Sequence, residues 1–214
     1  MHWITVAPGL PGTSVRVLGV QTLALLTLVL ICMQSSGLMA EGDQPSADDL
    51  IESLGLKGHI EGGFYRRTYE STGQPRISTG DSERFSMTSI YYLLTAGGPI
   101  GHFHRNQSDI VHYYHLGDPI EYVLIHPDGE LQTVVMGPDP RRGHHLQLTV
   151  VGGVWKASRL TPGGVHGYGL ISEAVSPGFD YRDMTLGVTS ELLTAFPQHR
   201  SYIEALSTEV APQR

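Results

Sequence analysis

Cysteine is almost absent from this chain of 214 residues. The single cysteine, Cys32, lies in an apolar segment near the N-terminus that we expect to be removed. A mature chain without that segment has no thiol, so it forms neither a disulfide bond nor a thiolate metal site. The fold must therefore be held by its apolar core, which a single domain of this length can supply.

Basic residues are also scarce. Lys and Arg number 14 against 21 Asp and Glu, and the formal net charge is −7. Loss of residues 1–40, which contain Arg16 and no acidic residue, changes that charge from −7 to −8. The chain has no run of Lys and Arg of the kind that binds phosphate backbones, so its composition argues against a nucleic-acid partner.

Long apolar runs are limited to one segment, Val17 to Met33. Arg16 precedes this segment and small residues follow it, which is the layout of a secretory signal peptide. We expect cleavage after Ala40, or alternatively after Gly37, and a protein that is secreted or stays in the secretory pathway. The alternative is an uncleaved signal anchor that holds the protein in a membrane through residues 17–33, because about 17 apolar residues is the lower limit for spanning a bilayer.

Long helical patterns are missing as well. A short helix is predicted to begin at the N-cap Ser46, with acidic residues in its first turn, and to end at Gly55. Runs with strand composition and intervening turn signals follow at residues 64–69, 86–94, 111–116, 120–126, 131–136, 145–151, 154–160, 167–172 and 183–188. Two short helices are predicted at residues 190–196 and 201–206. Short strands at this spacing predict an all-β protein, an antiparallel sandwich or barrel.

Histidine, in contrast, is concentrated in one window. Residues 102–115 contain His102, His104, His112 and His115 together with Asp109, in a region that reads as short strands. Imidazole is the commonest metal ligand and the natural acid or base near neutral pH. We therefore expect the chemistry of the protein in this window.

Ordered motifs around this window resemble the cupin superfamily. The first motif is Gly97 or Gly98 with His102-x-His104 and Gly117, and the second is residues 151–156, Val-Gly-Gly-Val-Trp-Lys. Further segments are similar to a cupin group with no settled general function: Glu61-Gly62-Gly63-Phe64-Tyr65-Arg66, Ile90-Tyr91-Tyr92-Leu93-Leu94, Phe103-His104-Arg105, Gly117-Asp118-Pro119 and Pro177-Gly178-Phe179-Asp180.

The resemblance implies a single jelly-roll barrel, a double-stranded β-helix around a ligand pocket, and a homodimer. On this basis the chain divides into a signal segment at 1–40, a lead-in with a helix at 41–58, the cupin domain at 59–190 and a short helical tail at 191–214.

The metal site of the superfamily, which uses two histidines and a glutamate from the first motif and a histidine from the second, is incomplete here. By the family spacing, Ile110 replaces the glutamate and Lys156 replaces the last histidine. An ammonium group has no lone pair for a metal. A modified site remains open, in which His102, His104 and His112 bind zinc, iron or manganese in a decarboxylase or dioxygenase. No cofactor is favoured over histidines that are hydrogen-bonded in a polar pocket.

Lys156 points to a metal-free alternative. A buried lysine can replace a metal as the positive group that stabilises a developing enolate oxygen. His104 or His112 is then the base. Tyr91 or Tyr114 is the acid of an isomerase or epimerase that acts on a polar, sugar-like substrate, similar to the cupin-fold sugar-nucleotide epimerases. Equally open is a structural role for Lys156 in a salt bridge with Glu61, Asp109 or Glu173.

Glu61, Arg66 and Asn106 are further candidates for binding a small polar ligand. Glu61 and Arg66 bracket a predicted strand rich in aromatic residues, where they contact a ligand or pair with each other. Asn106 opens the glycosylation sequon Asn106-Gln107-Ser108, whose use requires exposure; close to His104, it is alternatively a hydrogen-bonding group of the pocket. A third reading of the chain is a binding or structural cupin without chemistry.

Overall fold

The computed structural model describes residues 44–80 and 82–209. The expected signal segment at residues 1–40, with its alternative as a membrane anchor, lies outside the described residues. Within the part of the chain that the structure describes, no helix combines the length and the apolar character needed to cross a membrane.

The predicted first helix is confirmed as α2 (Ala47–Ser53), and a pair of reciprocal hydrogen bonds fixes its start. The Ser46 hydroxyl accepts from the backbone N–H of Asp49 at 3.1 Å, and the Asp49 carboxylate accepts from the backbone N–H of Ser46 at 3.0 Å. These bonds satisfy donors that the first turn of a helix otherwise leaves free.

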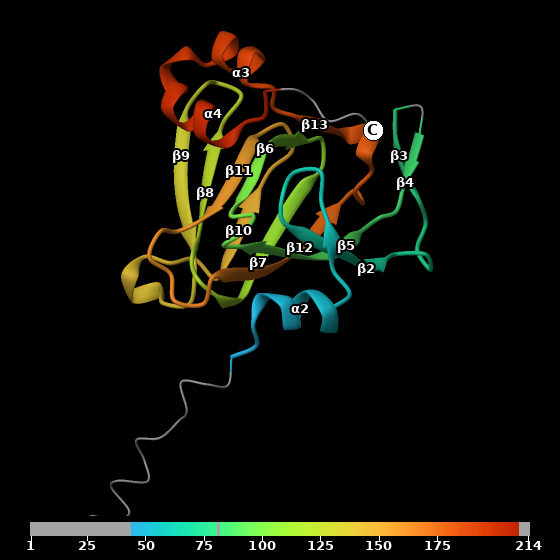
Figure 1. The fold of residues 1–214 in the computed structure, drawn as a ribbon. Coiled ribbons are helices and arrows are strands. Elements are labelled where there is room, and N and C mark those ends of the chain that lie inside the picture. Colours follow the sequence, from blue (N-terminus) through green and yellow to red (C-terminus); the bar gives the residue numbers. More distant parts are fainter. Residues whose placement is uncertain (1–43, 81, 210–214) are drawn as a thin grey trace, which may run out of the picture. The chain divides into compact units, whose positions relative to one another are not determined.

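Two antiparallel sheets face each other and make up most of the domain (Figure 1). One sheet has the strand order β1-β2-β5-β12-β7-β10, the other has the order β13-β6-β11-β8-β9, and β3 and β4 form a separate hairpin. The first sheet contains β1 (Lys57–Gly58), β2 (Phe64–Glu70), β5 (Thr88–Thr95), β12 (Tyr168–Ser176), β7 (Asp109–Gly117) and β10 (Gln147–Val150). The second contains β13 (Met184–Leu186), β6 (Ile100–Asn106), β11 (Trp155–Leu160), β8 (Ile120–Ile125) and β9 (Leu131–Met136), and the hairpin is β3 (Ile77–Thr79) with β4 (Ser82–Arg84).

The expected all-β jelly roll is confirmed. Each of the nine predicted strands is present, with ends shifted by a few residues. β6, which carries His102 and His104, and the short strands β1, β3 and β4 are additional. The two closing helices are present as α3 (Thr189–Ala195) and α4 (Arg200–Leu206), and the single-turn helices are η1 (Pro140–Arg142), η2 (Tyr181–Asp183) and η3 (Pro197–His199).

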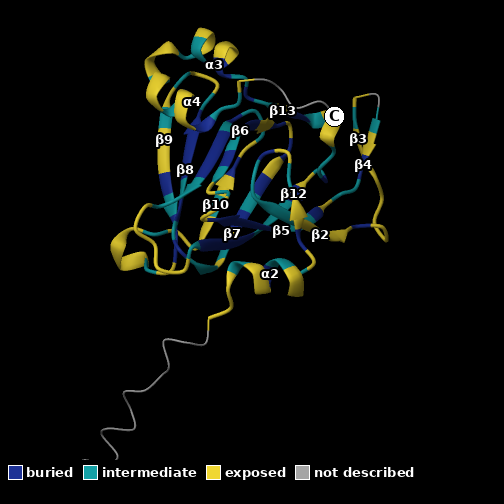
Figure 2. Ribbon diagram, viewed as in Figure 1, coloured by how far each residue is buried: buried dark blue, intermediate teal, exposed yellow. Residues whose placement is uncertain are grey.

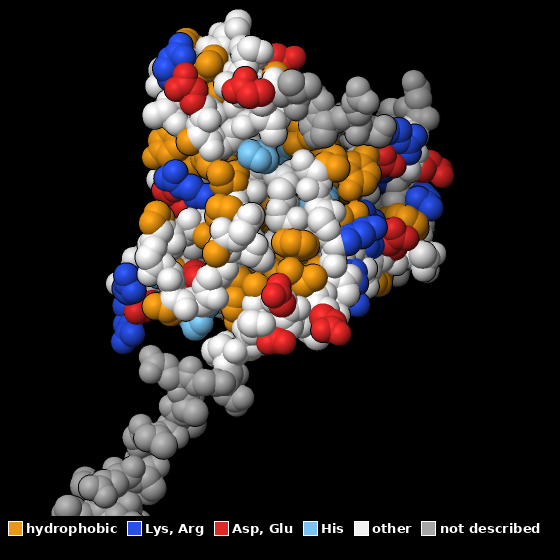
Figure 3. All heavy atoms as spheres, in the orientation of Figure 1, with side chains coloured by type: hydrophobic (Ala, Val, Ile, Leu, Met, Phe, Trp, Pro, Cys, Tyr) orange, Lys and Arg blue, Asp and Glu red, His pale blue; other side chains and the backbone are white. Residues whose placement is uncertain are grey.

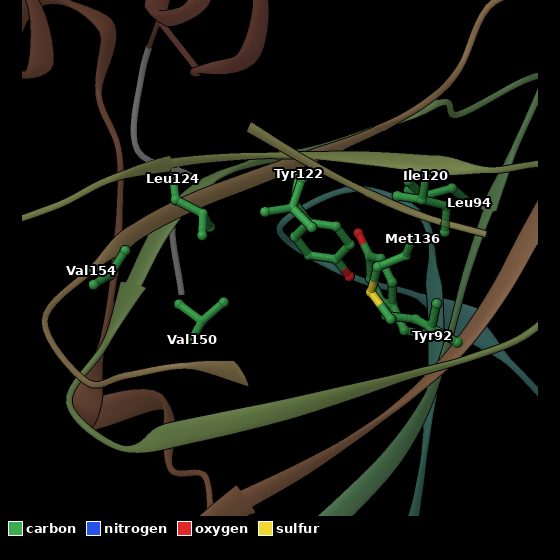
Figure 4. Packing of buried hydrophobic residues seen from close by; sticks show 10 residues of the cluster. Tyr92, Leu94, Ile120, Tyr122, Leu124, Met136, Val150 and Val154 are labelled. Atoms are coloured by element: carbon green, nitrogen blue, oxygen red, sulfur yellow. The ribbon is translucent and has the colours of Figure 1, made fainter. Parts of the chain in front are cut away.

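Alternation along the strands distributes the apolar side chains over three clusters. Figure 2 shows which parts of the strands are buried, and Figure 4 shows the cluster that contains Tyr92 and Tyr122. Tyr92 and Leu94 of β5 point between the sheets, where they pack with Tyr122 of β8, whereas Leu93 packs on the outer side with residues of α2. Helices α3 and α4 cover the outer face of the second sheet. Because full burial of one Leu or Ile side chain stabilises the fold by about 1.5–3 kcal/mol, these contacts hold the helices in place.

Basic and acidic side chains lie next to one another on the face drawn in Figure 3. Among the surface ion pairs are Arg141–Asp139 at 2.9 Å, Arg182–Asp180 at 2.8 Å and Arg200–Glu204 at 2.8 Å. Exposed pairs of this kind contribute at most about 1 kcal/mol each. The stability of the domain therefore rests on the apolar clusters.

Candidate functional site

A pocket of about 720 Å³, its mouth included, opens into the space between the two sheets. Its polar lining comes from His59, Glu61, Tyr65, His104, Asn106 and Tyr181, and its apolar lining from Ile90, Ile110, Val175 and Phe179; Arg67, Glu70 and Glu173 complete it. The pocket therefore combines apolar surface with groups that can orient a polar ligand.

Glu61 reaches this pocket because the loop before β2 lies directly against β6. The carbonyl oxygen of Glu61 accepts a hydrogen bond from the N–H of His102 at 2.6 Å, and that of Gly62 accepts one from the Tyr92 hydroxyl at 2.9 Å. Gly62 has a φ of 101°, and a Cβ at this position would collide with the Ile100 carbonyl oxygen. Only glycine permits this close approach, which explains the Glu61-Gly62-Gly63 motif.

His104 lines the pocket, and its hydrogen bonds define its tautomer. Its Nδ1 lies 2.8 Å from the backbone carbonyl oxygen of His102, which can only accept, so Nδ1 carries a proton. In the neutral ring the lone pair is consequently on Nε2, which lies 3.3 Å from Oε2 of Glu61. His104 is therefore a base with a fixed tautomer, and Glu61 lies where it can stabilise the imidazolium formed by proton uptake.

The two buried groups have pKa values below their ordinary range. Burial raises the pKa of the Glu61 carboxyl, but the charges of His104, His59 and Lys156 and a hydrogen bond with His59 outweigh it and lower the pKa to about 2. Burial lowers the pKa of His104 to about 4, although Glu61 acts in the opposite direction. At neutral pH, Glu61 is thus an anion and His104 is a neutral imidazole.

These pKa shifts predict that acid destabilises the fold in two steps. The unfolded chain protonates His104 near pH 6.5, whereas the folded chain does so only near pH 4, so the free energy of unfolding falls as the pH drops from 6.5 towards 4. Protonation of Glu61 lowers the free energy of unfolding further between pH 4.5 and about pH 2, because the unfolded chain binds this proton at a higher pH than the folded chain. Urea unfolding at about pH 7 and about pH 4.5 should show a smaller pH effect in His104→Gln than in the wild type.

The matched control for this measurement is His145→Gln, because His145 is exposed. Burial also lowers the pKa of His112. The free energy of unfolding of His104→Gln should therefore keep part of its pH dependence. An equal pH effect in the wild type and in His104→Gln would contradict the assignment.

A second polar cluster bridges the two sheets beneath the pocket. Nζ of Lys156, from β11, lies 3.0 Å from Nε2 of His112 and 3.4 Å from Oε1 of Glu173, on the opposite sheet. The salt bridge between Lys156 and Glu173 considered from the sequence is thus present. Burial raises the pKa of Glu173 and Lys156 opposes this effect. Lys156 lines a small inner space together with Glu61 and His104, and it is not among the residues that line the ligand pocket.

The structure brings some of the predicted site residues together and separates others. Glu61, His104 and Asn106 line the pocket, and His112 and Lys156 lie directly beneath it. Asn106 is buried and its Oδ1 has no hydrogen-bond partner, which is unfavourable for glycosylation and suitable for ligand contact.

The tyrosines Tyr91 and Tyr114, expected to act as acids, do not line the pocket. Tyr91 packs on the outer side of the first sheet, against the apolar cluster that includes Leu50 of α2. The Arg66 guanidinium also lies on this side, 6.0 Å from the Tyr91 ring. Both side chains face outwards because the residues of a strand alternate between its two faces. The Tyr114 hydroxyl donates to the carbonyl oxygen of Gly117 at 2.5 Å, and burial raises its pKa to about 12. Tyr92 and Tyr122 are buried in the cluster between the sheets, and Tyr65 and Tyr114 pack against it.

His102 lies at an irregularity in the pairing of β6 with β11. The register shifts between the pairs Lys156↔His104 and Ser158↔Gly101, which leaves one additional residue in β6. Such a bulge interrupts the alternation of side chains. His102 does not line the ligand pocket, and its Nδ1 is buried without a hydrogen-bond partner.

The proposed three-histidine metal site does not fit this arrangement. Nε2 of His112 is bonded to the Lys156 ammonium, while Nε2 of His104 faces Glu61. Across residues 44–80 and 82–209, no three His, Cys, Asp or Glu side chains are placed so that they could hold a metal ion. Ile110 is buried in the pocket wall, as the family spacing indicated, and Asp109 is exposed.

His59, Tyr65 and Tyr181 line the pocket although sequence reasoning gave their side chains no role. His59 and Glu61 are two residues apart, and Nδ1 of His59 lies 3.4 Å from Oε2 of Glu61. Tyr181 follows the Pro177-Gly178-Phe179-Asp180 motif directly. Proximity to these two motifs was the available signal, but it does not show where a side chain points.

Comparison with known proteins identifies the family of this fold and pocket. Residues 48–187 match the family described as Cupin superfamily (DUF985). Uncharacterized protein YML079W of Saccharomyces cerevisiae is 40% identical over 150 residues, which are 65% of this chain and 74% of that protein. A hypothetical protein from Leishmania major is 34% identical with a TM-score of 0.72, and it covers 77% of this chain and 100% of its own.

Protein SO0799 from Shewanella oneidensis is 36% identical with a TM-score of 0.68, over 77% of this chain and 98% of its own. The family match spans more than half of the chain and includes the histidine window and Lys156. This protein therefore belongs to the cupin superfamily, in the family DUF985.

Proposed function

We propose that this cupin binds a small polar molecule in the pocket and transfers a proton on it without a metal, as an isomerase or epimerase of a sugar-like carbonyl compound. The observation that carries the proposal is the fixed tautomer of His104. His104 lines the pocket, and its basic Nε2 lies 3.3 Å from the Glu61 carboxylate. A neutral imidazole next to an anion that stabilises its protonated form is the arrangement of a general base.

The other polar groups have supporting roles in this proposal. His104 removes a proton from the carbon next to the carbonyl group, and the Asn106 amide binds the oxygen on which negative charge develops. Tyr65, which lines the pocket, replaces Tyr91 and Tyr114 as the candidate that returns a proton on the other face. Lys156 acts indirectly, because its charge lowers the pKa values of Glu61 and His104 from beneath the pocket.

The test is solvent-deuterium exchange. Keto sugars and related carbon acids that bind the purified protein are incubated with it in heavy water, and deuterium incorporation at the carbon next to the carbonyl group is followed by NMR. We expect incorporation into at least one of them. If every compound that binds stays unlabelled, the protein is a binding cupin and the proton-transfer proposal is wrong.

Metal content separates this proposal from the decarboxylase or dioxygenase alternative. Elemental analysis of the purified protein is expected to find no stoichiometric zinc, iron or manganese, and exposure to a chelator should leave deuterium exchange unchanged. The physical reason is that the Lys156 ammonium occupies the neighbourhood in which a metal would lie and repels a cation. One equivalent of any of these metals, lost together with activity, would overturn the metal-free mechanism.

A further inference from the structure

We propose that His59 and Tyr181 carry protons between the buried Glu61–His104 pair and solvent. This inference rests on the proposed function, because it assigns the route by which the removed proton is exchanged. The groups form a continuous chain. Nε2 of His104 lies 3.3 Å from Oε2 of Glu61, which lies 3.4 Å from Nδ1 of His59, and Nε2 of His59 lies 3.3 Å from the Tyr181 hydroxyl.

Burial explains why the pair needs such a route. The side chains of His104 and Glu61 are 7% and 9% exposed, and that of His59 is 6% exposed. Tyr181, by contrast, is 37% exposed and lies at the start of η2. A bound ligand would cover the pocket further, so the chain through His59 leads from the enclosed pair to the surface.

Packing holds the chain in place. The His59 ring meets the Tyr65 ring edge-on at 4.4 Å and stacks on the Tyr181 ring with centroids 6.2 Å apart. The backbone N–H of His59 donates to the Gly63 carbonyl oxygen at 3.0 Å. The Tyr181 ring also contacts Phe179, and its hydroxyl lies 3.3 Å from that of Tyr65. These contacts keep both relay side chains aligned with Glu61.

One tautomer of His59 can accept a proton from Glu61. The backbone N–H of Glu61 points at Nδ1 of His59 at 3.4 Å, and in the tautomer that accepts this contact Nδ1 has the lone pair and Nε2 has the proton; in the other tautomer Nδ1 donates to Oε2 of Glu61. The outward passage uses the first tautomer. The proton that His104 removes passes to Oε2 of Glu61 and from there to Nδ1 of His59. At the same time the Nε2 proton moves to the Tyr181 oxygen, and the Tyr181 O–H proton goes to water.

One proton thus leaves the ligand and one reaches solvent, without a ring flip and without a net change in charge along the chain. The only change is that His59 now carries its proton on Nδ1. The reverse passage returns a solvent proton to the ligand and restores the starting tautomer. Imidazole suits this position because its two nitrogens accept on one side and donate on the other.

The test measures proton exchange without a substrate. In protein labelled with [13C]histidine, NMR relaxation dispersion at the midpoint of the His104 titration gives the rate at which His104 gains and loses its proton. Glu61, His59 and Lys156 are the ionisable groups that act on His104. Tyr181→Phe removes the hydroxyl alone, and we expect it to slow this exchange by roughly tenfold or more. His59→Gln, whose amide cannot carry a proton, should slow it as well.

The control is Tyr113→Phe, because Tyr113 is 38% exposed and lies on β7, away from the chain. It should leave the rate unchanged. Exchange rates in both Tyr181→Phe and His59→Gln within about twofold of the wild type would overturn the relay. Because no substrate is involved, a failure to label keto sugars refutes the proposed function without changing this result, and the two ideas fail by separate measurements.

Discussion

Replacement of His104 by glutamine is expected to lower deuterium exchange into the keto sugar that the wild type labels by about 10²- to 10⁴-fold, the range that general bases contribute. Glutamine keeps a polar side chain of similar reach, and its amide can still donate to the His102 carbonyl oxygen. It has no lone pair of comparable basicity to replace Nε2. Ligand affinity should change much less than the exchange rate, because the remaining lining of the pocket is intact.

His115→Gln is the control for this experiment. His115 belongs to the same sequence window, but it is exposed and meets Tyr91 edge-on at 5.9 Å. Its replacement should leave exchange within about twofold of the wild type, since it touches no group that moves a proton. If His104→Gln exchanges deuterium as fast as His115→Gln, another group is the base and the proposed mechanism is wrong.

Replacement of Lys156 by methionine is expected to destabilise the fold by about 3–5 kcal/mol, the usual cost of removing one partner of a buried ion pair. Lys156 is 3% exposed, and its ammonium group is the cation next to Glu173. Without it, the buried carboxylate of Glu173 is uncompensated, and His112 loses the donor bonded to its Nε2. Urea unfolding at neutral pH measures the loss.

Two further measurements separate this charge effect from a defect in packing. The double variant Lys156→Met/Glu173→Gln removes both charges and should recover most of the lost stability. The pH dependence has a definite sign. Burial raises the pKa of Glu173 above 4.5 in the folded chain, and loss of Lys156 raises it further, so the folded state binds the proton more tightly than the unfolded state.

The stability deficit of the single variant relative to the wild type should therefore shrink below pH 4.5 and grow as the pH rises through the folded pKa. If the loss of stability is the same at neutral pH and below pH 4.5, Lys156 acts through packing alone. The same conclusion would follow if the double variant were as unstable as the single variant. The same variant links stability to function, because loss of the Lys156 charge raises the pKa values of Glu61 and His104, so the pH dependence of deuterium exchange should shift to higher pH. Unchanged exchange in Lys156→Met or Lys156→Ala would contradict the proposed role of this charge.

Local sequence predicted the inward residues of regular strands correctly. Ile110 and His112 of β7 are two residues apart, and both face the interior. Asp109, which precedes Ile110, is exposed, and its carboxylate accepts a hydrogen bond from the N–H of Gly152 at 2.8 Å. Lys156, for which the sequence left open a catalytic role or a salt bridge, is also buried and is paired with Glu173. Alternation is a property of the strand backbone itself, so it can be read from spacing once a single inward residue is known.

The same rule could not choose between Tyr91 and Tyr92. Both are aromatic and adjacent, and only the packing of β5 against α2 on one side and against β8 on the other places Tyr91 outside and Tyr92 inside. The bulge in β6 is a second example. The bulge shifts the register between Gly101 and His104. His102 therefore does not face the pocket as His104 does, although residues at positions i and i+2 of a regular strand share a face.

By itself, the amino-acid sequence determined the all-β architecture, the cupin motifs, the absence of the superfamily's usual metal ligands at Ile110 and Lys156, and the location of the candidate site near His104. Only the tertiary structure decided which partners these groups have: Glu61 and His59 for His104, Glu173 and His112 for Lys156, and Tyr181 at the surface. Strand periodicity is fixed by neighbouring residues along the chain. The partners come from distant segments, whose approach depends on sheet pairing, on the bulge in β6 and on the contact that Gly62 permits.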